Sequence, residues 1–216
     1  MTEKLALPAG SFAPWLCSIL RALTEETGVD VPCGECTACC RSSQFIHVRP
    51  EEVQALSRIP GELLFPAPGQ PEGTLLLGFD EHGRCPMLIE EKCSIYKYRP
   101  LTCRNYDCRV FSAAGISAGE DEEGPINRQA QRWKFSYSTG SDRNLHSAVL
   151  AAATFLIGRT ERFPAGVVPT NSTQLALLAI KVHDIFLKHI EQCSGTEHTP
   201  PDSEIAAAVI EAIENF

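Results

Sequence analysis

Four cysteines fall within eight residues near the start of the chain, and no other stretch restricts the fold as strongly. They are Cys33, Cys36, Cys39 and Cys40, in the spacing C-x2-C-x2-C-C. Two cysteines three positions apart, with small or turn-forming residues between them, can direct both sulfur atoms to one point, as in zinc knuckles and iron–sulfur ligand runs. The spacing therefore predicts a metal site.

A second block adds four more thiols, which are Cys85, Cys93, Cys103 and Cys108. The alternatives to metal ligation are a disulfide framework or unliganded thiols in the core. Ten cysteines in 216 residues fall below the roughly 8 to 10% typical of disulfide scaffolds, and a chain of this length can bury a core without cross-links. Metal binding is therefore the stronger hypothesis for the eight clustered cysteines. Cys17 and Cys193 lie outside both blocks, and Cys17 is expected to be a small buried hydrophobe on a helix.

The spacing within each block favours one shared centre over two separate ones. Cys39 and Cys40 are neighbours, so in an extended chain their side chains point to opposite faces and a sharp bend is needed to bring both to one metal. The second block has gaps of seven, nine and four residues between its cysteines, which is loose for a self-contained site. We expect Cys33, Cys36 and Cys39 or Cys40 to be completed by Cys85, Cys93 or Cys103.

Several motifs together carry a resemblance to a known family. They are C-x2-C-x2-C-C, Gly83-Arg84-Cys85-Pro86-Met87-Leu88, and Cys93-Ser94-Ile95-Tyr96 followed by Arg99-Pro100-x2-Cys103-Arg104-x-Tyr106. Residues 33–108 resemble the YkgJ-type cysteine-cluster family, which is described as a zinc- or iron-chelating domain and whose members are often labelled iron–sulfur-cluster proteins. The resemblance implies a metal site in a small cytoplasmic protein and implies no particular reaction. Cys108 lies outside the minimal family pattern.

Basic side chains gather around the second block. Residues 84–109 hold Arg84, Lys92, Lys97, Arg99, Arg104 and Arg109 against three acidic residues, which gives 6 − 3 = +3 in a chain of net charge −8. Thiolate ligands around a metal leave negative charge, which nearby cations offset. Arg99 and Arg104 are expected to act in this way, or to hold an anionic substrate; the alternative is a solvated surface. Tyr96 is expected to pack against the cofactor, with a catalytic role as the alternative.

His47 is weighed as a further ligand, because imidazole binds both zinc and iron, although an isolated histidine in a strand is more often structural. Apolar periodicity predicts helices over 11–27, 142–158, 171–193 and 200–215, and short strands near 45–48 and 74–79. The fold class expected is mainly α with a few short strands, with cysteine-rich metal-binding loops packed on a helical domain. We expect one domain over 1–216, with a cysteine-cluster core at 28–110 and a helical portion at 126–216.

The remaining features limit the class of function. A net charge of −8 argues against a general nucleic-acid binder. The sequence contains no run of 18 apolar residues, so no membrane span is predicted. The N-terminus lacks a secretory signal, so the cytoplasm is expected. Three hypotheses follow: an iron–sulfur protein, with a [4Fe–4S] cluster favoured, in a redox or transfer role; a zinc protein with a structural or interaction role; or a metal carrier or sensor. We expect the partner to be a protein or a small molecule. An oxidoreductase or transferase activity that depends on the cluster is one alternative, and the absence of enzymatic activity is the other.

Overall fold

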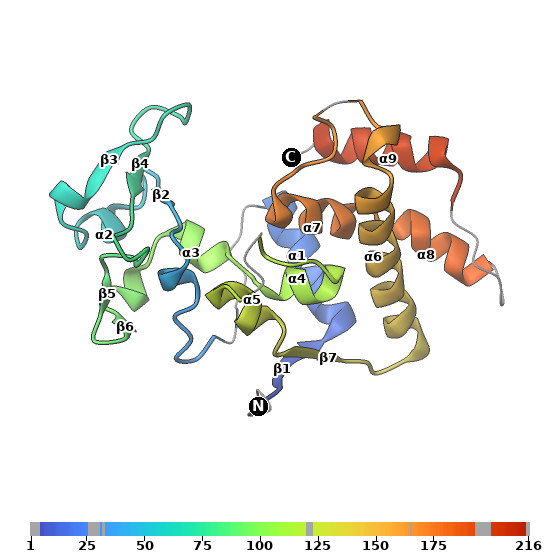
Figure 1. The fold of residues 1–216 in the computed structure, drawn as a ribbon, viewed down its shortest axis with the longest axis horizontal. Helices are drawn as coiled ribbons and strands as arrows, with labels where there is room; N and C mark the ends of the chain where they lie inside the picture. Colours follow the sequence, from blue (N-terminus) through green and yellow to red (C-terminus); the bar gives the residue numbers. More distant parts are fainter. Residues whose placement is uncertain are drawn as a thin grey trace. The chain divides into compact units, whose positions relative to one another are not determined.

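The computed structural model describes residues 5–25, 31, 33–119, 123–164, 166–192 and 200–214. The chain divides into two compact units. The helical unit comprises Met1–Glu26, Cys108–Glu123 and Asn127–Phe216, and the cysteine unit comprises Thr27–Asp107 and Gly124–Ile126. The elements are mainly helices with a few short strands (Figure 1), so the predicted fold class is confirmed in that respect.

The helical unit begins with strand β1 (Leu7–Ser11) and helix α1 (Phe12–Glu25). The helix buries Phe12, Trp15, Leu16 and Ile19, the stripe that three- and four-residue spacing predicts. Cys17 is exposed, so the expectation that it is buried is wrong. It follows Leu16 by one position, and one helical step of about 100° carries its side chain off the apolar stripe.

Strand β7 (Trp133–Ser136) pairs in parallel with β1. Two short helices precede β7, namely α4 (Arg109–Ala114) and α5 (Pro125–Ala130). Helix α4 is buried along most of its length, including Val110 and Phe111, and it packs against α6 (Gly140–Gly158).

Helix α6 packs against the next two helices, α7 (Ser172–Lys181) and α8 (His183–Gln192). The sequence predicts one helix over 171–193, whereas the structure has two helices that are interrupted at Val182. The side chain of His183 makes a hydrogen bond to the carbonyl oxygen of Ile180 (Nδ1–O 2.7 Å), and a side chain that competes for a main-chain carbonyl weakens the helical ladder there. The short turn η4 (Thr160–Arg162) lies between α6 and α7, and α9 (Asp202–Glu214) follows.

The cysteine unit contains a three-stranded antiparallel sheet with the strand order β2-β4-β3. The strands are β2 (Ile46–Val48), β3 (Leu64–Pro66) and β4 (Leu75–Leu77). Its other elements are the hairpin of β5 (Leu88–Ile89) and β6 (Lys92–Cys93), the short helices α2 (Val53–Leu56) and α3 (Leu101–Asn105), and the 3-10 turns η1 (Cys39–Arg41), η2 (Gly61–Leu63) and η3 (Tyr96–Tyr98).

A small apolar core holds this unit together. It consists of Ile46, Val48, Ala55, Ile59, Leu77, Met87 and Ile95. Cys85, Cys93 and Cys103 are partly buried and pack against it. Cys85, Cys93 and Cys103 therefore sit on the edge of the unit's core, beside the sheet, the hairpin and α3.

Candidate metal centre

The first half of the C-x2-C-x2-C-C motif is a tight turn. The backbone N–H of Cys36 donates to the carbonyl oxygen of Cys33 (3.0 Å), and Gly34 inside the turn has φ +55°. The left-handed backbone conformation is unfavourable for residues other than glycine, so glycine suits position 34. The Sγ atom of Cys36 accepts the N–H of Ala38 at 3.5 Å. The turn thus brings the backbones of Cys33 and Cys36 close together.

The second half of the motif forms the 3-10 turn η1, which contains both Cys39 and Cys40. In a 3-10 turn successive side chains are rotated by about 120°, far less than the opposition of an extended strand. The turn therefore keeps the side chains of Cys39 and Cys40 from lying on opposite faces of an extended chain. Both cysteines line the cavity described below.

Backbone hydrogen bonds join the two cysteine blocks. Cys85 donates its N–H to the carbonyl oxygen of Cys40 (2.8 Å), and Ser43 donates to the carbonyl oxygen of Gly83 (2.9 Å). A turn at Asp80 to Gly83 precedes Cys85, closed by a bond from Gly83 N–H to Asp80 oxygen (2.9 Å). Main-chain pairing therefore brings the start of the second block against the end of the first.

Seven cysteines from both blocks line one cavity of about 380 Å³. They are Cys33, Cys36, Cys39, Cys40, Cys85, Cys93 and Cys103. All seven are partly buried. Thiols of both blocks therefore line the same cavity, and the expectation that they share one metal centre stays a prediction.

Three of these thiols have a raised pKa. Burial raises the pKa of Cys40 to about 11, with further repulsion from Cys85 and Cys93 and a small opposing effect of Arg41. Burial raises the pKa of Cys103 to about 12, with repulsion from Cys85, Cys40 and Cys93. Burial also raises the pKa of Cys85.

Two residues that the sequence offers as ligands are placed elsewhere. Cys108 occupies the N-cap position of α4 in the helical unit, where its Sγ accepts the indole N–H of Trp133 at 3.1 Å. It is not among the residues that line the cavity. His47 lies in β2, and its carbonyl oxygen accepts the hydroxyl of Thr102 (2.8 Å). We do not include Cys108 or His47 among the ligands proposed below.

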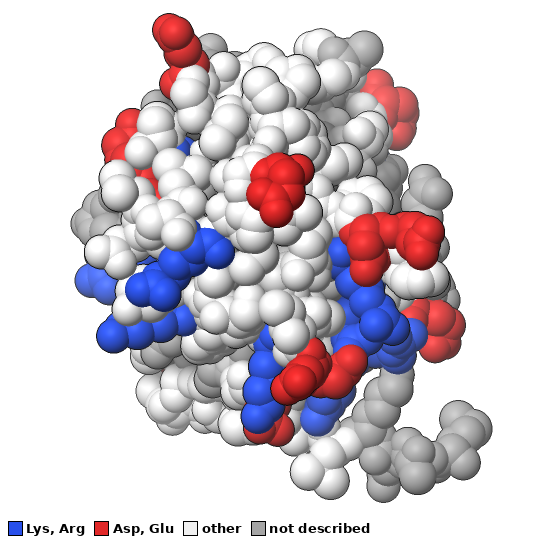
Figure 2. Space-filling view, turned by 90° about the vertical axis from the view of Figure 1, so that its left-hand side faces the viewer, with Lys and Arg blue, Asp and Glu red and all other residues white. Residues whose placement is uncertain are grey.

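The basic residues of the second block separate into different environments. Arg99, Arg104 and Lys92 line the cavity, whereas Arg109 is buried in the helical unit and donates to the carbonyl oxygen of Ala9 (3.1 Å). Seen from the end where β3 and β4 are labelled in Figure 1, basic side chains form separate groups with a broad uncharged area between them (Figure 2). The basic residues of the second block therefore do not share one environment.

Arg99 is held in place by Tyr96. Its guanidinium stacks over the Tyr96 ring (4.1 Å to the centroid) and donates to the Tyr96 carbonyl oxygen (2.9 Å). Arg99 also lowers the pKa of Cys103, against the larger effect of burial. The stacked pair therefore fixes a positive charge beside the most strongly perturbed thiol.

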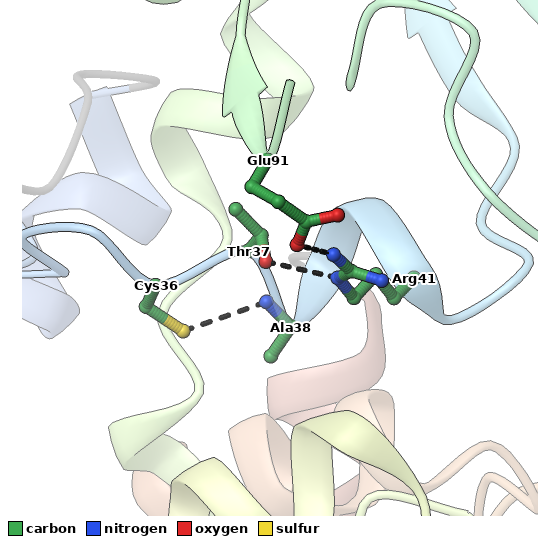
Figure 3. Close-up of polar contacts among 5 residues, drawn as sticks. All are labelled: Cys36, Thr37, Ala38, Arg41 and Glu91. Atoms are coloured by element: carbon green, nitrogen blue, oxygen red, sulfur yellow. Dashed lines mark hydrogen bonds and ion pairs between the residues drawn. The ribbon is translucent and has the colours of Figure 1, made fainter. Parts of the chain in front are cut away.

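One feature of the site has no signal in the sequence. The guanidinium of Arg41, at the end of η1, donates from Nε to Thr37 Oγ1 (3.1 Å) and forms an ion pair with Glu91 of the β5–β6 turn (Figure 3). Glu90 and Glu91 have φ of +48° and +63°. Type I′ hairpin turns require positive φ at both central residues and normally use asparagine and glycine, and each left-handed residue of another type costs roughly 1–2 kcal/mol.

The donor set fits a soft metal or a metal–sulfur cluster, because thiolate is the ligand that both prefer. Within the described ranges, no three His, Cys, Asp or Glu side chains come close enough together to hold a metal ion directly. Ligation therefore requires the thiols that line the cavity to draw closer.

Residues 32–129 match the family model CxxCxxCC, described as "Putative zinc- or iron-chelating domain". The match confirms the resemblance to the cysteine-cluster family and covers slightly less than half of the chain. No curated protein and no solved structure matches the chain. Among the described helices, none has the length and apolar character needed to cross a membrane.

Proposed function

We propose that the cysteine unit binds an iron–sulfur cluster in the cavity lined by seven cysteines, and that the protein has a redox role. The observation that carries the proposal is the gathering of Cys33, Cys36, Cys39, Cys40, Cys85, Cys93 and Cys103 on one cavity. A tetrahedral zinc ion takes four ligands, so seven thiols exceed the need of one zinc site. When bound, an iron–sulfur cluster supplies one-electron redox chemistry.

The charges of the cavity wall support the same proposal. Arg99, Arg104 and Lys92 line the cavity together with Glu35 and Glu91, and Glu91 is already paired with Arg41. Positive charge near thiolates favours their ionised form and raises the potential of an iron–sulfur site. We assign Arg99, Arg104 and Tyr96 to this role, in which Tyr96 acts by holding Arg99.

Zinc binding with a structural or interaction role is the second candidate. The Cys33–Cys36 turn and the N–H of Ala38 that points at Cys36 Sγ are features that serve zinc knuckles as well as clusters. A C-x2-C turn of this kind with two thiols of the second block would supply the four ligands of one zinc ion.

Anaerobic purification followed by analysis of iron, acid-labile sulfide and zinc distinguishes the two candidates. Iron and sulfide in equal amounts, with visible absorption that bleaches on reduction, support the cluster. Zinc without sulfide, in a colourless protein, supports the second candidate. A preparation that binds neither metal after reconstitution with iron and sulfide or with Zn²⁺ contradicts both.

A further inference from the structure

Two segments that carry cysteines meet through side chains as well as through the main chain. Arg41 ends η1 directly after Cys40, and Glu91 lies in the hairpin turn two residues before Cys93. Their ion pair joins segments 50 residues apart in the sequence. The Nε atom of Arg41 donates at the same time to Thr37, which lies between Cys36 and Cys39.

We propose that Arg41 and Glu91 form a clamp that positions the first cysteine block against the β5–β6 hairpin and slows the exchange of metal at the cavity. The inference rests on the proposed function, because it concerns the same seven-cysteine cavity. Arg41 and Glu91 are positioning residues that act through the cysteines beside them.

The geometry of the hairpin turn supports this role. A turn of Glu90 and Glu91 with positive φ at both positions is unfavourable for these residue types, and strained conformations persist where the surrounding structure holds them. The turn brings the carboxylate of Glu91 to Arg41 (Figure 3). Glu91 also lines the cavity, as does Thr37.

The exposure of the pair limits the size of the effect. The side chain of Glu91 is 70% exposed and that of Arg41 is 26% exposed. Exposed ion pairs change equilibria by a small amount, which corresponds to about a twofold to fivefold change in an equilibrium constant. The clamp is therefore expected to tune the opening between the blocks and to leave the fold intact.

The decisive measurement is hydrogen exchange in the reduced full-length protein as purified, with the metal content matched between the variants. Two amides report on the contact between the blocks, namely Cys85 N–H, bonded to Cys40, and Ser43 N–H, bonded to Gly83. In Arg41→Gln and in Glu91→Gln we expect both amides to exchange about twofold to fivefold faster. The charge-swapped variant Arg41→Glu/Glu91→Arg should recover protection because it restores the ion pair. The recovery should be only partial, because the variant lacks the hydrogen bond from Arg41 to Thr37.

The matched control is Glu90→Gln. Glu90 lies in the same turn with a positive φ, and its substitution removes one negative charge while leaving Arg41 and Glu91 in place. Both amides should keep the wild-type exchange rate in this variant. Unchanged exchange in the two single variants, or an equal increase in Glu90→Gln, overturns the clamp.

A second readout connects the clamp to metal. The protein is loaded with Co²⁺, and the decay of its thiolate-to-metal absorption is followed after EDTA is added. We expect Arg41→Gln and Glu91→Gln to release Co²⁺ faster by a similar factor, with partial recovery in the swapped variant, and an unchanged release rate contradicts the effect on metal exchange. A wild-type protein that takes up neither Co²⁺ nor a reconstituted cluster overturns the proposed function, whereas the amide exchange still decides the clamp.

Discussion

The backbone N–H of Cys85 donates to the carbonyl oxygen of Cys40 across 2.8 Å, which joins the last cysteine of the first block to the first cysteine of the second. Main-chain atoms make this contact, so it does not depend on either thiol. Replacing a cysteine by serine changes one donor atom and leaves the pairing of the blocks in place. Cysteine-to-serine variants of this protein therefore report mainly on ligation.

The cavity-lining cysteines should differ sharply from Cys17 in their effect on metal binding. We expect Cys36→Ser and Cys103→Ser to weaken metal binding at least about tenfold. Loss of a residue that only hydrogen-bonds to a ligand already lowers metal affinity by about tenfold or more, so loss of a ligand should cost at least as much. Cys17 lies exposed on α1, so Cys17→Ser should keep the wild-type metal content. Metal analysis of the purified variants checks this. If Cys17→Ser loses its metal, the division between ligating and other cysteines is wrong.

Removing the metal should destabilise the cysteine unit, whatever the metal is. The loops around 33–45 and 80–107 contain few regular elements and only a small apolar core. Thiolate metal sites supply on the order of 10 kcal/mol of binding free energy, which becomes folding free energy. A strong chelator should lower the melting temperature and speed amide exchange in these loops, while α6 and α7 stay protected. A melting temperature that does not change on removal of the metal contradicts the prediction.

The raised thiol pKa values predict how the metal-free cysteine unit responds to alkali. In the unfolded chain the thiols ionise near pH 9, whereas Cys40 and Cys103 in the folded unit ionise only at about 11 and 12. The folded state therefore holds more protons between these limits, and its stability is full below pH 9 and falls as the pH rises toward 12. Denaturant unfolding of the reduced, metal-free protein at pH 8, 9.5 and 10.5 measures this. Cys40→Ala and Cys103→Ala should each reduce the slope.

The same raised pKa values predict that metal affinity increases with pH, whereas the stability of the metal-free unit decreases. A thiol must lose its proton to bind a metal, so buried thiols release protons when the metal enters. We expect Zn²⁺ affinity to rise with pH over the neutral range and the buffer to take up the protons that are released. Titration calorimetry in two buffers of different ionisation enthalpy measures the number of protons. A value of zero would show that the ligating thiols are already ionised.

Periodicity predicts much of the helical unit, because its helices bury continuous apolar stripes. Helix α6 buries Ala148, Val149, Ala152 and Leu156, as expected for residues 142–158. The break between α7 and α8 escapes the same reasoning, since the apolar pattern continues through it. The contact of His183 with the carbonyl oxygen of Ile180 is a side-chain interaction that periodicity does not describe.

The cysteine spacing predicts which cysteines line the cavity, with the exception of Cys108. It does not predict the contacts that hold the two blocks in place. Local turns are encoded locally, as in Gly34 between Cys33 and Cys36. The pairing of Arg41 with Glu91 depends on a left-handed Glu90-Glu91 turn, and two glutamates carry no turn signal. Cys108 shows the opposite difficulty, because closeness in sequence to Cys103 does not keep it in the cysteine unit. Its partner is Trp133, far along the chain.

Glu52 is a second contact that the sequence does not reveal, and it fixes the helix that carries Cys103. Its Oε1 atom accepts the N–H of Leu101, the first residue of α3, at 2.5 Å, and its Oε2 atom accepts the N–H of Arg49 at 2.9 Å. One carboxylate thus satisfies two backbone donors from separate segments. Hydrogen bonds to a charged acceptor contribute more than neutral ones, at roughly 1.5–3 kcal/mol.

Glu52→Ala should therefore lower the free energy of unfolding of the cysteine unit by about 2–3 kcal/mol, because both amides lose their acceptor. Glu51→Ala is the matched control, since Glu51 is the neighbouring carboxylate and is exposed, and its substitution should change the free energy by less than about 0.5 kcal/mol. Urea unfolding of the reduced, metal-free variants measures both. Because Leu101 begins the helix that holds Cys103, Glu52→Ala should also bind Zn²⁺ more weakly. Equal unfolding free energies for the two variants would show that the Glu52 contact does not anchor α3.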